Sequence, residues 1–207
     1  MPASYINGNW MDGFSQSREY IVTQGPLPNT IDAFWRMVWE FKVCQIVMIT
    51  NLKEKGRVKC EKYWPFEGEQ LKIGDLILLC EEVKLHAAFQ VAQLRVVHRH
   101  TGVAHTVHHL WFQDWPDHGV PDTTEAVIDL LLTSRELRTR ALASREQVAP
   151  IAVHCSAGIG RSGVFVGCDI LLQQAESFGQ VDALGALCHM RRARGGCVQT
   201  PHQWLYM

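Results

Sequence analysis

The chain has 207 residues, of which 47% are hydrophobic and 20% charged, and its formal net charge is -1. Such a composition is typical of one globular domain with a sizeable core. The balance of basic and acidic residues leaves no global positive field, so no nucleic-acid partner is expected. No apolar run approaches the roughly 20 residues that span a bilayer, and the first ten residues lack a signal-peptide pattern, so we expect no membrane contact in this segment.

Hydrophobic periodicity predicts the elements in chain order. A helix begins after the capping residue Asn29 or Thr30 and presents Phe34, Met37, Val38 and Phe41 to the core. Strands are predicted at 45–50, 75–83, 88–99 and 104–112, then a helix at 123–140, a strand at 151–153, helices at 162–178 and 181–192, and a short helix from Pro201. Strands before helices, with some mixing, favour a single α/β domain over residues 1–207, or an α+β one, with a twisted mixed β-sheet flanked by helices.

Seven cysteines are scattered along the chain without a CxxC pair. An odd, unpatterned set indicates reduced thiols in a cytoplasmic setting. Six lie among apolar or strand-like neighbours and are interpreted as small buried hydrophobes: Cys44, Cys60, Cys80, Cys168, Cys188 and Cys197. Cys155 differs because its neighbours are Gly and Ser.

The stretch IAVHCSAGIGRSGVF, residues 151–165, places Cys155 where a predicted strand gives way to a predicted helix. A thiolate is the reactive form of a cysteine, and it is favoured at a helix N-terminus or beside a cation. The small residues that follow allow successive backbone N–H groups to form an anion-binding nest, and the helix adds its positive end. Arg161 offers a planar fork for two oxygens of one phosphate. The stretch therefore predicts a loop that holds a phosphate over the sulfur.

Other interpretations of this stretch are weaker. It could be a Gly-rich turn with a buried cysteine and a solvated arginine, whereas a nucleotide P-loop would need the absent GxxxxGK[ST] pattern. A cysteine protease would need His154 as the base for Cys155, but adjacent residues on a strand point to opposite faces. We expect His154 to orient or electrostatically support the loop. Five histidines between 98 and 109 lack a carboxylate or thiol at ligand spacing, so neither a metal nor a cofactor is predicted.

The sequence resembles the classical protein tyrosine phosphatases, a cysteine-dependent family whose signature loop is similar to VHCSAGIGRSG, residues 153–163. Four further segments match in the expected order. YINGNW (5–10) and YIVTQGPLPNTIDAFWRMVWE (20–40) are similar to family segments, WPDHGVP (115–121) to the mobile acid loop, and CVQTPHQ (197–203) to the glutamine segment. The resemblance covers nearly the whole chain.

The resemblance implies hydrolysis of phosphotyrosine in proteins or peptides through a phosphocysteine intermediate. Cys155 would be the nucleophile, Arg161 the phosphate clamp, and Asp117 the acid that protonates the leaving phenolate and then the base for water. Gln199 would position that water, with Gln203 as its auxiliary. The domain would be cytoplasmic, alone or as the cytoplasmic part of a larger or receptor-type protein.

The resemblance also implies supporting residues. Ser162 would hydrogen-bond the sulfur and ease its departure, and Gly119 and Pro121 would bracket a lid anchored by Trp115. The remaining substrate contacts would come from the signature loop: Ser156, Ala157, Gly158, Ile159 and Gly160.

Each of four further charged residues has two possible interpretations. Glu54 and Lys59 either contact the signature arginine and the acid loop or belong to a solvated charge run. Arg191 and Arg194 either form a neighbouring pocket for a second phosphate or are solvated helix-end cations.

Two family features lie outside the matched segments. In the family, the phosphotyrosine-recognition loop, with its stacking tyrosine, precedes the segment that YINGNW matches, and the family's closing helix is cut at Met207. We therefore expect a cleft without one aromatic wall and a partly uncovered core. This leaves a second function class, a weakly active or inactive phosphotyrosine-binding or scaffolding remnant. A third, a dual-specificity phosphatase with a shallow cleft, is disfavoured by FWRMVWE and QTPHQ, which belong to the tyrosine-specific pattern.

Overall fold

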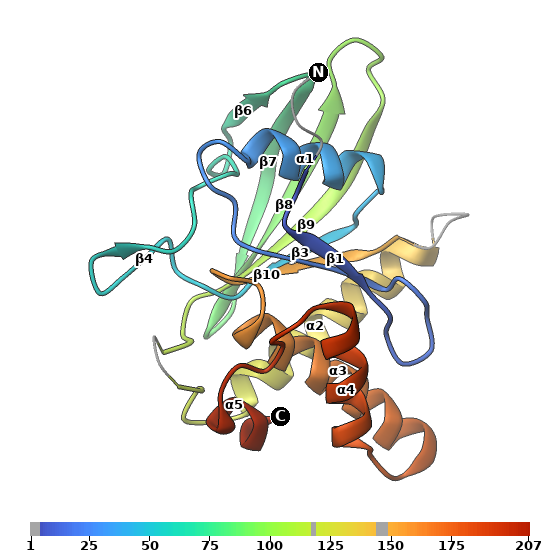
Figure 1. The fold of residues 1–207 in the computed structure, drawn as a ribbon. Helices are drawn as coiled ribbons and strands as arrows, with labels where there is room; N and C mark the ends of the chain where they lie inside the picture. Colours follow the sequence, from blue (N-terminus) through green and yellow to red (C-terminus); the bar gives the residue numbers. More distant parts are fainter. Residues whose placement is uncertain (1–4, 117–118, 144–148) are drawn as a thin grey trace.

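An eight-stranded mixed sheet forms the centre of the computed structural model, which describes residues 5–116, 119–143 and 149–207 (Figure 1). The strand order is β1-β2-β10-β3-β9-β8-β7-β6. The strands are β1 (Gly8–Met11), β2 (Tyr20–Thr23), β3 (Gln45–Met48), β6 (Gln70–Ile73), β7 (Leu76–Leu85), β8 (Phe89–His98), β9 (Ala104–Phe112) and β10 (Ile151–His154). A separate hairpin pairs β4 (Lys53–Glu54) with β5 (Arg57–Val58). The predicted α/β class with a mixed sheet is confirmed.

Helices cover both faces of the sheet. The helix α1 (Ile31–Glu40) lies on one face, and α2 (Glu125–Ala143), α3 (Gly160–Phe178), α4 (Ala183–Ala193) and α5 (Pro201–Tyr206) gather on the other (Figure 1). Each face has its own core: Phe34 of α1 packs in one cluster of buried residues, and Phe165 of α3 packs in the other. Within the described ranges, no helix has the length and apolar content needed to cross a membrane.

The strand β10 lies in the middle of the sheet, although it comes last in the chain. It runs parallel to both β2 and β3, and β3 runs parallel to β9. The four parallel strands therefore end at the same edge, which is where ligands bind in α/β sheets. The residues that follow His154 emerge at the centre of that edge.

The predicted long elements are all found, with shifted bounds. The helix α3 begins at Gly160 instead of Ser162, and β3 ends at Met48 instead of residue 50. Five strands were not predicted: β1, β2, β4, β5 and β6. Each has only two to four residues, too few for a period of two to be recognised; the equally short β3 and β10 were predicted from their apolar runs. Thr30 precedes α1, but its hydroxyl accepts from the N–H of Leu27 instead of capping the helix.

Two expectations about buried residues were wrong. Phe41 is 45% exposed and packs edge-on against Trp10, because α1 ends at the preceding residue. Cys188 is exposed on α4 beside the buried Leu187, and Cys168 is only partly buried. The other four cysteines interpreted as buried hydrophobes are buried, and all seven are free.

Candidate active site

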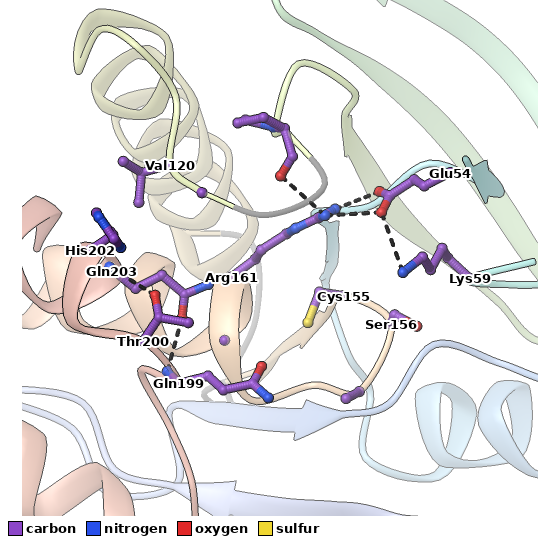
Figure 2. A pocket seen from close by; sticks show the side chains of 14 residues that line it. Glu54, Lys59, Val120, Cys155, Ser156, Arg161, Gln199, Thr200, His202 and Gln203 are labelled. Atoms are coloured by element: carbon purple, nitrogen blue, oxygen red, sulfur yellow. Dashed lines mark hydrogen bonds and ion pairs between the residues drawn. The ribbon is translucent and has the colours of Figure 1, made fainter. Parts of the chain in front are cut away.

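Cys155 lies on the floor of a cavity at the carboxyl edge of the sheet. It directly follows β10, is 5% exposed, and accepts a hydrogen bond at its Sγ from the N–H of Gly158 at 3.2 Å. Because α3 begins at Gly160, the sulfur lies at the N-terminus of this helix, where negative charge is stabilised. Figure 2 shows Arg161, Gln199 and Ser156 around the sulfur.

The cavity has a volume of about 580 Å³ and brings most of the predicted site residues together. The predicted site residues that line it are Cys155, Ser156, Ala157, Gly160, Arg161, Gln199 and Gln203. Glu54 and Lys59, which had two interpretations each, and Gly119, assigned to the lid, line it as well. Among the described residues, Pro116, Val120, Thr200 and His202 also line the cavity; they lie in the matched acid-loop and glutamine segments but were not singled out as site residues. Gly158 and Ile159 do not line the cavity; they are considered below.

Arg194 holds the outer side of the signature loop. Its guanidinium donates from Nε to the carbonyl of Gly158 at 2.6 Å and from Nη2 to the carbonyl of Ala157 at 3.1 Å. The same group donates to Asn9 Oδ1 at 2.6 Å and Asn7 Oδ1 at 3.1 Å, and Arg194 is only 6% exposed. The residue is therefore neither a solvated helix-end cation nor an accessible cation for a second phosphate.

The neighbouring loop carbonyls are held in the same way. The carbonyl of Ser156 accepts from the N–H of Gly25 at 2.9 Å, and that of Ile159 accepts from the N–H of Val198 at 3.0 Å. Four consecutive carbonyls, at residues 156–159, thus bond to donors outside the loop. Because the N–H and C=O of a peptide unit point in opposite directions, this arrangement favours N–H groups on the cavity side, as an anion nest requires.

Gly158 explains why the loop follows this path. Its φ is +70°, a left-handed conformation that favours glycine, and a Cβ there would lie 1.9 Å from the carbonyl oxygen of Thr23 at the end of β2. The residue therefore packs against the sheet behind the cavity. Gly158, one of the predicted substrate contacts, donates its N–H to the sulfur of Cys155. Ile159, another predicted contact, is the next residue of the loop.

Arg161 forms a buried bidentate ion pair with Glu54 of the β4–β5 hairpin. Nη1 lies 2.6 Å from Oε1 and Nη2 lies 2.9 Å from Oε2, and Nη2 also donates to the carbonyl of Pro116 at 3.3 Å. Lys59 lies 3.8 Å from the same carboxylate (Figure 2). The charged residues left open at positions 54 and 59 thus belong to the site, and Glu54 fixes the guanidinium plane at the cavity wall.

The acid-loop segment is anchored by Trp115. Its indole N–H donates to the carbonyl of Gly119 at 3.0 Å, and its ring is 3% exposed and lies edge-on against Phe112 and Tyr206. The predicted general acid, Asp117, lies outside the described residues. The predicted anchoring role of Trp115 is consistent with these contacts.

The glutamine segment reaches the signature loop from α5. The side-chain oxygen of Gln203 accepts from the backbone N–H of Gln199 at 2.8 Å, and Thr200 caps α5 by accepting from the N–H of Gln203 at 3.2 Å. A Cβ on Gly160 would lie 2.9 Å from Gln203 Nε2 and 3.3 Å from Gln199 Oε1. Both amides therefore contact the loop, and Gln203 ties down the backbone of Gln199.

Ser162 differs from its expected contact. The residue is fully buried in the first turn of α3, and its hydroxyl makes no hydrogen bond within the part of the chain that the structure describes. The hydrogen bond predicted between Ser162 and the sulfur of Cys155 is not formed in this structure.

His154 supports the loop from behind through a buried hydrogen-bond chain. Its Nε2 lies 2.7 Å from the hydroxyl of Tyr63, which lies 2.8 Å from Nε2 of His109, and its Nδ1 lies 3.0 Å from the carbonyl of Cys155. A carbonyl only accepts, so Nδ1 carries the proton and Nε2 accepts from Tyr63, while His109 donates to the same hydroxyl. Tyr63 and His109 were not predicted, since only the fold brings them beside β10.

These buried groups are neutral. Burial lowers the pKa of His154 to about 4 and that of His109 well below 6.5, and it raises the pKa of Tyr63 well above 10. Of the two roles expected for His154, orienting the loop is the one that its hydrogen bonds support, because burial disfavours the charged imidazole. His154 also faces Tyr63 on the α1 side, whereas Cys155 packs in the opposite core, as the strand alternation predicts.

A thiol at a helix N-terminus, inside a nest of backbone N–H groups and in one cavity with a fixed arginine, defines the class of this site: an anion-binding loop built around a cysteine. A family model described as Protein-tyrosine phosphatase matches residues 1–207. The chain belongs to the protein-tyrosine phosphatase family and is a domain of that kind.

Two relatives illustrate the range of similar proteins. The receptor-type tyrosine-protein phosphatase eta of Gallus gallus is 41% identical over 203 residues, which are 98% of this chain and 14% of that protein. The tyrosine-protein phosphatase non-receptor type 7 of Mus musculus is 40% identical over 206 residues, which are 99% of this chain and 55% of that protein. The chain therefore spans only part of the length of these relatives.

Proposed function

We propose that this domain hydrolyses phosphotyrosine in proteins through a phosphocysteine intermediate. The observation that carries the proposal is that the Cys155 sulfur and Arg161 line one cavity at the N-terminus of α3, with the loop carbonyls bonded to donors outside the loop. This geometry suits a phosphate dianion, whose equatorial oxygens would accept from the loop N–H groups and the guanidinium.

In the first step, Sγ of Cys155 attacks phosphorus, so an S–P bond forms as the bond between phosphorus and the tyrosine oxygen breaks. Asp117 gives its proton to the leaving oxygen; because the conjugate acid of that phenolate has a pKa of about 10, such a donor contributes roughly 10²–10⁴ in rate. In the second step, water attacks phosphorus and gives its proton back to Asp117. The S–P bond then breaks, releasing inorganic phosphate and the thiolate.

The supporting roles follow from the contacts. Glu54 would keep the Arg161 fork oriented for two phosphate oxygens, and His154 would fix the carbonyl of Cys155. Gln199 would aim the attacking water, with Gln203 holding its backbone. A reducing cytoplasmic setting is part of the proposal because the nucleophile must remain a thiol, and all seven cysteines are free.

Phosphate release from a phosphotyrosine peptide by the purified chain tests the proposal. We expect turnover that Cys155→Ser abolishes and that Asp117→Asn lowers by roughly 10²–10⁴-fold, with little release from the matched phosphoserine peptide. A folded chain that releases no phosphate would overturn the proposal. If Cys155→Ser then still captured the phosphotyrosine peptide, the domain would be a binding module.

A further inference from the structure

Val198, the residue before Gln199, has an unusual backbone conformation. Its φ is +56°, in the left-handed region, and it is 2% exposed. For a β-branched residue this conformation is a genuine outlier, since the branched Cβ crowds the following carbonyl. Among the described non-glycine residues with positive φ, Val198 is the only β-branched one. Contacts from outside the segment must therefore hold it there.

Arg191 of α4 makes the first set of these contacts. Its Nε donates to the carbonyl of Cys197 at 2.9 Å and its Nη2 donates to the carbonyl of Val198 at 2.9 Å. The planar fork thus binds the two carbonyls that flank the strained residue, a pairing that one ammonium cannot reproduce in the same geometry. These bonds engage the guanidinium within the chain.

The signature loop and the start of α3 make the second set of contacts to Val198. The N–H of Val198 donates to the carbonyl of Ile159 at 3.0 Å, and a Cβ on Gly163 would lie 2.7 Å from the nitrogen of Val198. The backbone of Val198 is therefore fixed between α4 and the start of α3. Because a change of φ at residue 198 rotates everything that follows, this position sets the direction in which Gln199 enters the cavity.

We propose that Arg191 is a positioning residue for hydrolysis of the phosphocysteine: it holds Val198 in its left-handed conformation and thereby aims the Gln199 amide at the attacking water. This role rests on the proposed phosphatase function and concerns its second step. Most of the phosphate cradle is held independently of Arg191, since the carbonyls of residues 156–158 bond to Gly25 and Arg194, and Val198 reaches only the carbonyl of Ile159.

Single-turnover kinetics with enzyme in excess over p-nitrophenyl phosphate separates the two steps. Nitrophenol release reports formation of the phosphocysteine, and inorganic phosphate release reports its hydrolysis. We expect Arg191→Met to slow phosphate release about tenfold while changing nitrophenol release less than about threefold. Arg192→Met, at the exposed neighbour on the same turn, is the matched control and should change neither rate.

A substitution that relieves the backbone strain at residue 198 should restore the rate of phosphate release. Glycine adopts a positive φ without cost, so adding Val198→Gly to Arg191→Met should recover most of the lost phosphate release, whereas Arg191→Lys alone should recover little. Equal slowing of both steps in Arg191→Met, or no recovery in the double variant, would overturn the positioning role even if the melting temperature is unchanged. A folded wild-type chain that releases no nitrophenol would instead overturn the proposed function, and this role with it.

Discussion

Gly158 and Gly102 offer a direct test of how the signature loop is packed. Both have a φ of +70°, so alanine at either position meets the same left-handed penalty, about 1–2 kcal/mol. They differ in their surroundings. A Cβ on Gly158 would lie 1.9 Å from the oxygen and 2.3 Å from the carbon of the Thr23 carbonyl, whereas a Cβ on Gly102 has nothing within 4 Å.

The difference between the two alanine variants therefore isolates the steric contact with β2. Overpacking against backbone costs about 1–3 kcal/mol, so we expect Gly102→Ala to lose about 1–2 kcal/mol and Gly158→Ala about 2–5 kcal/mol of unfolding free energy. For a chain of this size, each kcal/mol lowers the melting temperature by roughly 2–4 °C. Urea titration and thermal unfolding of both variants measure these losses.

The two alanine variants should also differ in catalytic activity. The N–H of Gly158 donates to the nucleophile and its carbonyl accepts from Arg194, so displacing this peptide should lower kcat/KM more than about tenfold. Gly102→Ala, in the turn between β8 and β9, should keep its activity. Equal losses of unfolding free energy in the two variants would refute the reasoning, because the loop would then not be wedged against β2.

Three further predictions follow from the buried groups of the site. The pKa of His154 is about 4 in the folded chain because burial disfavours its charged form, against about 6.5 for a free imidazole, so the unfolded chain binds the extra proton between these values. The free energy of unfolding should therefore fall by on the order of 3 kcal/mol for this group as the pH drops from about 6.5 to about 4. In urea titrations, His154→Gln should reduce this dependence of the unfolding free energy on pH. An unchanged dependence would count against burial of His154 as its cause. Glu54→Gln removes the charged partner of Arg161 and should lower kcat/KM for a phosphotyrosine peptide by about 10–100-fold, the equivalent of one hydrogen bond between charged groups at about 1.5–3 kcal/mol; a value within twofold of wild type would mean that the arginine is held by other contacts. Peroxide should oxidise Cys155 before the exposed Cys188, because the Cys155 sulfur accepts the N–H of Gly158 and lies at a helix N-terminus, where negative charge is stabilised. Mass spectrometry showing equal rates at the two thiols would contradict this.

Sequence reasoning predicted the long elements from their periodicity: the strands of nine or ten residues and the helices of ten or more. It also predicted the four-residue strands β3 and β10 from their apolar runs and the short helix α5 from Pro201, whereas β1 and β2, also with four residues each, were missed. The solvent-facing side of a helix was harder to predict than its existence. Phe41 was assigned to the core on helical spacing and Cys188 on its apolar neighbours, but the end of α1 and the outer side of α4 expose them.

The candidate site shows the same division. The residues from Cys155 to Arg161 are contiguous, so their chemistry is legible in one stretch, and Gln199 was located by its resemblance to a family segment. The partners are not contiguous: Tyr63, His109 and Arg194 come from three distant segments, and only the strand order and the end of α4 bring them to the loop. A lone tyrosine or histidine in a strand carries no signal of that kind.

The central position of β10 also has a consequence for how the chain reaches its active form. During synthesis, β2 and β3 are followed by four more strands of the sheet and by α2 before β10 appears, yet β10 must then pair with both of them. Pairing of this kind closes a long loop and is slow, and it leaves two unpaired strand edges until the end. Cys155, the proposed nucleophile, directly follows the strand that completes the sheet. Regain of catalytic activity during refolding should therefore lag behind the recovery of helical signal and report the final, topology-completing step, and a refolding chain held before that step would be inactive and prone to associate through its open edges.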